Sequence, residues 1–240
     1  MQLLPVQTKI LQPPQDDLYK ELQTVLPALQ NGDVIAISSK VIAIQEGRCV
    51  LKDGADKKQI VEKEADVIIE RSYWPTPLTI TRGAFIGAAG VDESNSGEYY
   101  TLLPTDSFAS AQLLRSFLMK EYGLTELGVV VTDSRSLPLR YGATAVAIGW
   151  WGIEPLEDHI GETDLFGRTM QYERSNIVDC IAAAAGLVMG EVAQRIPVVI
   201  IRDVPDIRFT DKNTKNDLFA SFDDDTFRVL YERFISPTDK

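Results

Sequence analysis

Apolar side chains recur at helical spacing over residues 107–122 and 176–190, and predict a helix in each segment. The first segment has Asp106 or Ser107 available as N-cap and Gly123 where a C-cap belongs. The second follows a serine that can cap it and carries four successive alanines, which permit close packing. These are the two clearest helices in the pattern.

Two further segments predict helices whose limits are less regular. Residues 16–29 carry an apolar stripe, but Pro27 should kink or shorten that helix. A final helix is expected to begin within residues 223–225 and to end near Phe234. Between these regions, residues 205–222 are polar and poorly periodic, and predict a covering loop.

Short apolar runs bounded by glycine, hydroxyl or charged residues predict strands. Two runs, Val34–Ile37 and Val41–Ile44, are separated only by Ser38–Lys40 and predict two successive strands. The remaining runs that predict strands are Val67–Ile69, Leu78–Thr81, Gly128–Thr132, Val146–Gly149 and Val198–Ile201. Helices and strands are interleaved without a regular βαβ alternation, which favours an α+β fold.

The charge balance narrows the class of partner. The chain of 240 residues has 35 acidic and 24 basic side chains, a net charge of −11, and a length that suits one large domain or two modest ones. Proteins bind nucleic acids and anionic membranes largely through Lys and Arg. The acidic charge balance therefore excludes nucleic acids and anionic membranes as partners. An anionic small-molecule ligand would need local basic groups, helix N-termini or metal ions.

Cysteine usage and hydropathy predict a cytoplasmic protein. Cys49 and Cys180 lie far apart without a CxxC pair, which favours two reduced, buried thiols over a disulfide. Residues 1–9 lack the pattern of a signal peptide, and the longest apolar run, residues 181–189, is too short to span a bilayer.

Common catalytic and nucleotide-binding motifs are missing from the sequence. It has no GxxxxGK[ST] or GxGxxG loop, no GxSxG elbow, no HExxH and no Cys/His metal cluster. His159 is its single histidine and is expected in a surface loop, which removes His-dependent triads. Any chemistry should therefore depend on carboxylates, hydroxyls and a metal ion.

Two acidic segments are candidates for that role. Residues 90–95 (GVDESN) follow a stretch of small residues, and residues 132–134 (TDS) follow an apolar strand. Asp, Ser and Asn supply the oxygen ligands that hard cations prefer. The alternative is that both segments are solvated turns, because these residues are also ordinary turn formers.

A larger set of short segments occurs in one order along the chain. Its members are Gly32–Val34, Ser39–Lys40, Glu46–Arg48, Gly90–Asn95, Leu102–Pro104, Ser110–Ala111, Thr132–Asp133, Ala147–Gly149, Gly161–Glu162, Asp164, Gly167–Arg168, Asp179, Ala182–Ala185, Met189–Gly190 and Pro197. The set resembles the coenzyme F420:L-glutamate ligase family over roughly residues 8–202.

The resemblance implies an activity, a fold and partners. Family members use GTP to activate a substrate carboxylate as an acyl phosphate, and join it to L-glutamate in a γ-glutamyl amide. The implied fold is an α+β arrangement of two lobes that works as a homodimer, with Mg²⁺ or Mn²⁺ and a monovalent cation such as K⁺. Residues 8–202 would form this ligase-like domain, and residues 203–240 a C-terminal loop and helix that pack on it.

Site residues carry over position by position. The implied metal ligands are Asp92, Asp133, Ser134 (often Thr in the family) and Glu191 (often Gln). The implied nucleotide contacts are Ser39, Lys40, Asn95 and the segment from Met189, Gly190 and Glu191 to Ile196, with residues 8–11 nearby. Lys40 could instead be a solvated lysine at a strand end, and Glu191 a solvated helix-end residue.

The chain departs from the family pattern beside the expected site. Arg135-Ser136-Leu137 replaces Phe-Gly-Arg, Leu139 replaces a Trp, and residues 142–145 replace Gly-Gln-Thr-Asp. Ile44 replaces an expected nucleotide-contacting Lys. The acceptor therefore need not be coenzyme F420.

Three hypotheses follow: a ligase for an acidic acceptor and glutamate, a nucleotide- or metabolite-binding homologue that has lost ligation, and a structural dimer. Trp150–Trp151 are expected to pack in the core rather than line an altered pocket.

Overall fold

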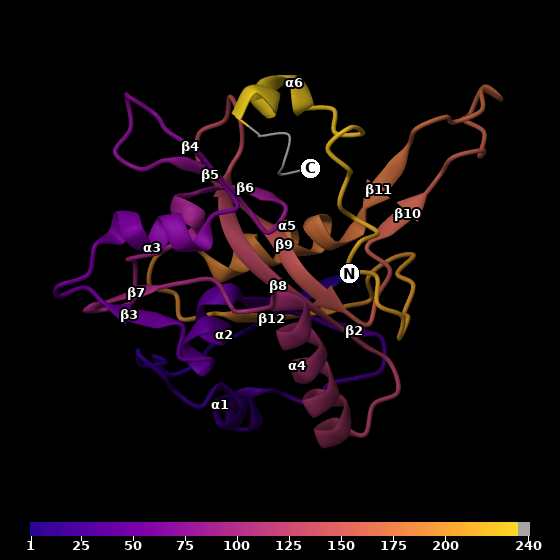
Figure 1. Ribbon diagram of the computed structural model, residues 1–240. Coiled ribbons are helices and arrows are strands. Elements are labelled where there is room, and N and C mark those ends of the chain that lie inside the picture. Colours follow the sequence, from indigo (N-terminus) through magenta and orange to yellow (C-terminus); the bar gives the residue numbers. More distant parts are fainter. Residues whose placement is uncertain (235–240) are drawn as a thin grey trace.

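A five-stranded sheet forms the centre of the computed structural model, which describes residues 1–234 (Figure 1). Strands β2 and β8 run parallel, and every other neighbouring pair is antiparallel. In spatial order the strands are β1 (Gln2–Val6), β12 (Val198–Arg202), β2 (Asp33–Ser38), β8 (Leu127–Ser136) and β9 (Ala143–Trp151). The mixed sheet with its helices confirms the predicted α+β class.

Helices cover both faces of this sheet. Three of them, α1 (Leu18–Val25), α2 (Ser39–Gln45) and α4 (Ser107–Tyr122), share one apolar cluster with Ile35, Ile37 and Val131. The fourth, α5 (Ile177–Met189), packs on the other face against Val34, Ala36 and Val130. A strand buried on both faces reads as a continuous apolar run, which is why β2 was visible in the sequence.

Local chemistry sets the limits of the two main helices. The Asp106 carboxylate accepts hydrogen bonds from the backbone N–H of Phe108 and Ala109, and Gly123 closes α4 with φ of +66°. Asn176, rather than the preceding serine, caps α5. At Gly149 an added Cβ would lie 2.5 Å from the Ser107 backbone, so only glycine lets α4 approach β9 this closely.

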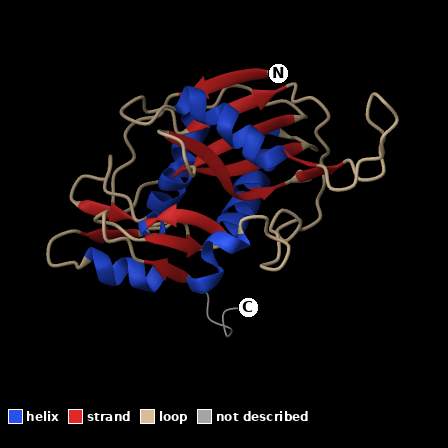
Figure 2. Cartoon of the chain, turned by 90° about the horizontal axis from the view of Figure 1, so that it is seen from above, coloured by secondary structure: helices blue, strands red, loops and turns tan. Residues whose placement is uncertain are grey.

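Two smaller sheets lie apart from the central one (Figure 2). One pairs β3 (Cys49–Leu51) with β7 (Tyr99–Thr101), and the other orders β4 (Val67–Ile69), β5 (Leu78–Thr81) and β6 (Ala84–Gly87). Helix α3 (Lys57–Glu64) and the 3₁₀ turn η1 (Ala88–Gly90) complete a separate small apolar cluster. The two-lobe division and the boundary between residues 202 and 203 stay predictions.

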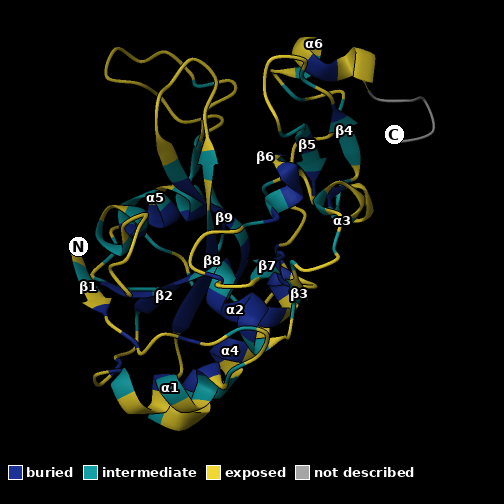
Figure 3. Cartoon of the chain, turned by 90° about the vertical axis from the view of Figure 1, so that its left-hand side faces the viewer, coloured by how far each residue is buried: buried dark blue, intermediate teal, exposed yellow. Residues whose placement is uncertain are grey.

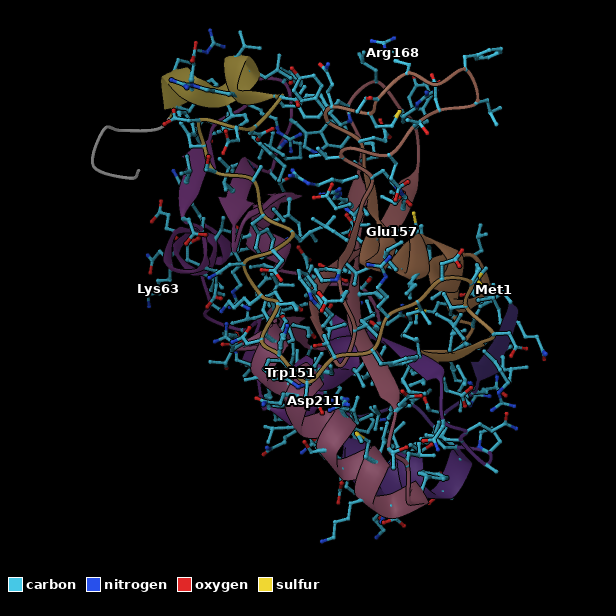
Figure 4. All side chains as sticks on the ribbon, turned by 90° about the vertical axis from the view of Figure 1, so that its right-hand side faces the viewer. Met1, Lys63, Trp151, Glu157, Arg168 and Asp211 are labelled. Atoms are coloured by element: carbon cyan, nitrogen blue, oxygen red, sulfur yellow. The ribbon has the colours of Figure 1, made fainter. Side chains whose placement is uncertain are left out.

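A hairpin and the C-terminal segment extend from this frame. The hairpin pairs β10 (Leu156–Asp158) with β11 (Arg174–Asn176), and its long loop carries Arg168 away from the body (Figures 1 and 4). The C-terminal segment ends in α6 (Arg228–Tyr231) and η2 (Glu232–Phe234), where Tyr231 meets Phe85 of β6 edge to face. No helix within residues 1–234 is long and apolar enough to cross a membrane.

The structure corrects one predicted strand and several limits. Residues 41–44 are helical, in α2, not a strand, because a four-residue apolar run has too little length to separate the two periods. The first helix covers only Leu18–Val25, since Leu26 is extended ahead of Pro27. The last helix begins at Arg228, after residues 223–225.

Two single-residue expectations hold. Trp150 is buried, donates a hydrogen bond to Thr214 at 3.0 Å and packs edge to face on Phe108, which confirms a packing role. His159 lies at the start of the hairpin loop within hydrogen-bond distance of Glu162 and Ser175, and it does not line the cavity described below. Figure 3 shows this loop as largely exposed.

Candidate active site

A cavity of about 1400 Å³ opens at the end of β8, where the central sheet faces the β4–β6 sheet and the C-terminal segment. One wall comes from β8, α2, residues 8–11 and residues 189–197. The other comes from Ile69, Leu78, Phe85, Ile86 and α6. The carboxyl end of a buried strand holds side chains rigidly, which suits a reactive site.

Lys40 and Asp92 form an ion pair at 2.6 Å in this cavity. Lys40 also donates to the carbonyl and hydroxyl oxygens of Ser94, while Ser94 donates from its backbone N–H and its hydroxyl to Asp92. Burial acts to raise the pKa of Asp92, but the Lys40 ammonium and the Ser94 donors hold it below its ordinary value. Asp92 is therefore an ionised, hydrogen-bonded carboxylate.

The loop that carries Asp92 is shaped by its small residues. Gly90 adopts φ of +74°, and a Cβ there would lie 2.7 Å from the Leu103 side chain. The turn then brings Asp92 into a β-bridge with Thr101 at the end of β7. Small residues before an acidic loop were the signal that selected this segment in the sequence.

Asp133 follows an irregularity in β8, where the register with β9 shifts between Val131 and Thr132. Its carboxylate accepts a hydrogen bond from the Ser39 hydroxyl at 3.2 Å. Burial, reinforced by the charge of Asp92, raises the pKa of Asp133 to about 6, against the opposing effects of Ser39, the Ser134 N–H and Lys40. Two carboxylates thus face the same space with one lysine between them.

The other expected residues lie along the α5 end of the cavity. Ser134 donates to the Glu191 carboxylate at 2.9 Å, and the Asn95 amide donates to the Val192 carbonyl at 2.7 Å. The Met189 sulfur lies 3.8 Å from the Thr132 hydroxyl, and Gly190 ends α5 with φ of +72°. The structure therefore brings nine expected positions to one cavity, counting Ser39 through its bond to Asp133, while their roles stay predictions.

A divalent ion fits the chemistry of these donors, which are all hard oxygen ligands. Within residues 1–234, no three His, Cys, Asp or Glu side chains converge on one point. The polar side chains of the site instead form three separate pairs: Lys40 with Asp92, Ser39 with Asp133, and Ser134 with Glu191. Mg²⁺ is usually held by one or two carboxylates together with substrate phosphates, so an incomplete protein cage matches a metal that arrives with a nucleotide.

Sequence reasoning missed the apolar wall of the cavity. Trp74, Phe85, Phe227, Leu230 and Phe234 line it, and Phe227 and Leu230 are about as exposed as surface residues, at 60% and 61%. The segment around Trp74 has no periodicity, and the last helix is too short to show an apolar face. Only the pairing of these distant segments in space reveals a shared surface.

Comparison with known proteins agrees with the motif order. Residues 51–203 match the family described as F420-0:Gamma-glutamyl ligase. A coenzyme F420:L-glutamate ligase of Methanococcus maripaludis is 33% identical over 245 aligned residues, with 95% of this chain and 97% of the relative covered. The chain belongs to the F420-0:gamma-glutamyl ligase family. The enzymes of the same name from Methanopyrus kandleri and Methanocaldococcus jannaschii are each 34% identical, over 94% and 83% of this chain and 96% and 86% of their own lengths.

The positions at which the sequence is expected to depart from the F420-0:gamma-glutamyl ligase pattern can be located in the structure. Ile44, Arg135 and Leu137 all line the cavity. Beyond them, Leu139 is fully exposed in the turn between β8 and β9. The changes therefore alter the walls of the cavity and the rim beside it, and leave Asp92 and Asp133 in place.

Proposed function

We propose that this protein is a GTP- and metal-dependent ligase that joins an acidic small-molecule acceptor to L-glutamate in a γ-glutamyl amide. The observation that supports this most is the meeting of Asp92, Asp133, Ser134 and Glu191 with Lys40 in one cavity. These residues come from segments far apart in the sequence. Unrelated surface turns would not be expected to meet in one cavity. The relatives named coenzyme F420:L-glutamate ligase supply the reaction type.

In this proposal Asp92, Asp133, Ser134 and Glu191 would supply oxygen ligands to Mg²⁺ or Mn²⁺, and the nucleotide phosphates would complete a protein cage that is incomplete by itself. The ion supplies charge neutralisation for the nucleotide phosphates, which is the main requirement of phosphoryl transfer. A site for K⁺ and a homodimeric state stay predictions from the family resemblance.

The chain's own residues bind and orient the substrates. Lys40 lies 2.6 Å from Asp92, and its ammonium offers a positive charge beside the phosphates. Ser39 fixes the Asp133 carboxylate, and the Asn95 amide ties the Asp92 loop to residue 192. The γ-phosphoryl group passes to the acceptor carboxylate as GDP leaves; the glutamate amine then displaces phosphate and loses a proton as the amide forms. The cavity walls shield the reacting carboxylate from water.

The apolar wall suits the part of the acceptor that does not react. Trp74, Phe227 and Leu230 offer exposed apolar surface there, beside the half-buried Phe85. Such a surface favours an acceptor with an aromatic body and an acidic end.

Phosphate release tests the proposal. The protein with Mg²⁺, GTP, L-glutamate and a panel of acidic aromatic acceptors should release phosphate only when an acceptor is present. Asp133→Asn should lower kcat at least about a hundredfold, because it removes a charge that acts on the transferring phosphoryl group. Asp53→Asn, at an exposed site outside the cavity, is the matched control and should leave the rate unchanged.

The altered segment at residues 135–145 supports a second candidate, a homologue that binds nucleotide without ligation. It predicts GTP binding by calorimetry and no phosphate release with any acceptor. Release that depends on acceptor and Asp133 would exclude this second candidate.

A further inference from the structure

Arg135 lies on the same face of β8 as Asp133. Side chains alternate along a strand, and Thr132 and Ser134 face the α5 side, where they contact Met189 and Glu191. Asp133 faces α2 through Ser39, so Arg135, two residues on, shares that direction. Arg135 lines the cavity, as does Leu137 just after the end of β8.

The Arg135 guanidinium has no partner among the described residues. Its Nε is shielded from solvent without a hydrogen bond, and no ion pair within residues 1–234 includes this side chain. The other cations of the cavity differ: Lys9 pairs with Asp16, Lys40 pairs with Asp92, and Arg71 donates to the Thr76 carbonyl. Arg195 also forms no ion pair with another residue of the described chain, but its side chain is exposed in a loop.

A shielded donor without an acceptor destabilises the folded protein. In a chain with a net charge of −11, a surplus of carboxylates is available to pair with an arginine, yet none does so here. Polar groups of a binding site commonly lack a partner within the protein, because the ligand supplies their hydrogen-bond partner.

We propose that Arg135 binds an oxyanion of a ligand in this cavity, either a phosphoryl group or a carboxylate. Both are planar or triangular arrays of anionic oxygens that a guanidinium recognises with two parallel hydrogen bonds. The inference rests on the proposed function, whose nucleotide, glutamate and acidic acceptor all carry such groups. It assigns a specificity-determining role to a residue outside the metal and nucleotide sets of the proposed function.

A positive charge can also be introduced at residue 137, close to Arg135. Leu137 lies two residues beyond Arg135 and lines the same cavity. Because residues 135 and 137 line one cavity, a guanidinium at either position can reach the same space. We therefore expect Leu137→Arg to substitute in part for a lost Arg135.

The experiment compares Arg135→Gln, the double variant Arg135→Gln/Leu137→Arg, and the control Arg208→Gln. Arg208 is exposed and lies outside the cavity. Calorimetry with the full chain measures the affinities for inorganic pyrophosphate, Mg²⁺–GDP, Mg²⁺–GTP and L-glutamate. Thermal unfolding of each variant without ligand measures the structural cost.

Arg135→Gln should weaken binding of one class of probe roughly tenfold to a hundredfold, while Arg208→Gln changes nothing. A loss confined to pyrophosphate and the nucleotides identifies a phosphoryl oxyanion, and a loss confined to L-glutamate identifies a carboxylate. The double variant should recover part of the lost affinity. Tm should stay the same or rise in Arg135→Gln, because the shielded Nε has no protein partner to lose.

Unchanged affinity of Arg135→Gln for every probe would overturn the inference. So would a lost affinity that comes with a lower Tm, since that pattern indicates structural support, or a double variant with no recovery at all. Because these readouts need no turnover, they remain informative if phosphate release fails. Oxyanion binding through Arg135 without release would refute the ligase proposal alone.

Discussion

The two walls of the cavity differ in how firmly the fold holds them. The wall at the end of β8 stands on fully buried residues such as Ile35 and Val131, and its two aspartates are held by Lys40 and Ser39. The opposite wall rests on a small sheet and a four-residue helix, and Trp74 and Leu230 are 59% and 61% exposed. Groups that act on a reacting centre need fixed geometry, whereas an apolar surface for the rest of a substrate tolerates adjustment.

The largest effect should separate the walls by stability. Ile35→Ala removes a fully buried side chain from the core behind β8, and should lower the free energy of unfolding by about 2–5 kcal/mol. Trp74→Ala, on the opposite wall, should change it by less than about 1 kcal/mol, because little apolar contact is lost at an exposed site. Urea unfolding of both variants measures the difference; equal losses would show that the walls are equally firm.

A smaller effect should appear in binding at the firm wall. Lys40→Met removes the ammonium that lies 2.6 Å from Asp92, and should weaken Mg²⁺–GTP binding roughly tenfold, with partial recovery in Lys40→Arg. Lys63→Met, on the exposed face of α3, is the control (Figure 4). Equal affinities of the Lys40 and Lys63 variants, measured by calorimetry, would exclude a role for Lys40 in nucleotide binding.

The contrast between the walls also explains what the sequence could predict of the fold. Helix α4 has a long, strongly patterned signal and the capping residue Asp106, and it lies where expected, whereas β8 and β9 contain the predicted apolar runs but extend beyond them. Residues 41–44 were misassigned because their apolar side chains are buried whether the backbone is helical or extended, and only the tertiary context of α2 decides. β1 and β10 were missed because their pairing partners, not their own patterns, define them.

The same limits apply to the site. Asp92 and Asp133 stood out because each follows a recognisable local signal, a small-residue turn and an apolar strand end. Arg135 was visible only as a departure from a pattern, since its shielded Nε is a property of packing. The apolar wall had no local signal, because Phe227 meets Trp74 and Phe85 in one cavity only after the chain has folded.

The smallest effect concerns the connection between the firm frame and the C-terminal segment. Asp106 caps α4 on the central sheet, and Lys215 of the C-terminal segment lies 3.7 Å from its carboxylate. Burial acts to raise the pKa of Asp106, but the N–H groups of Ala109 and Phe108, with Lys215, hold it below the ordinary value. Asp106→Ala should therefore cost about 1 kcal/mol of stability at pH 7.

The pH dependence of that cost distinguishes the charge from the cap. A carboxyl whose pKa is lower in the folded protein stabilises it fully above its unfolded pKa, near about 4 for Asp, and loses this effect as the pH falls through the folded pKa. The difference between the parent and Asp106→Ala should thus shrink between pH 5 and pH 3 by roughly the charge-dependent part of the cap. Asp106→Asn keeps an N-cap oxygen without a titrating charge, so its stability relative to Asp106→Ala should be nearly constant over the same range. If the Asp106→Ala difference is the same at both ends of the range in urea unfolding, the neutral hydrogen bonds alone stabilise the start of α4, and neither the carboxylate charge nor Lys215 contributes.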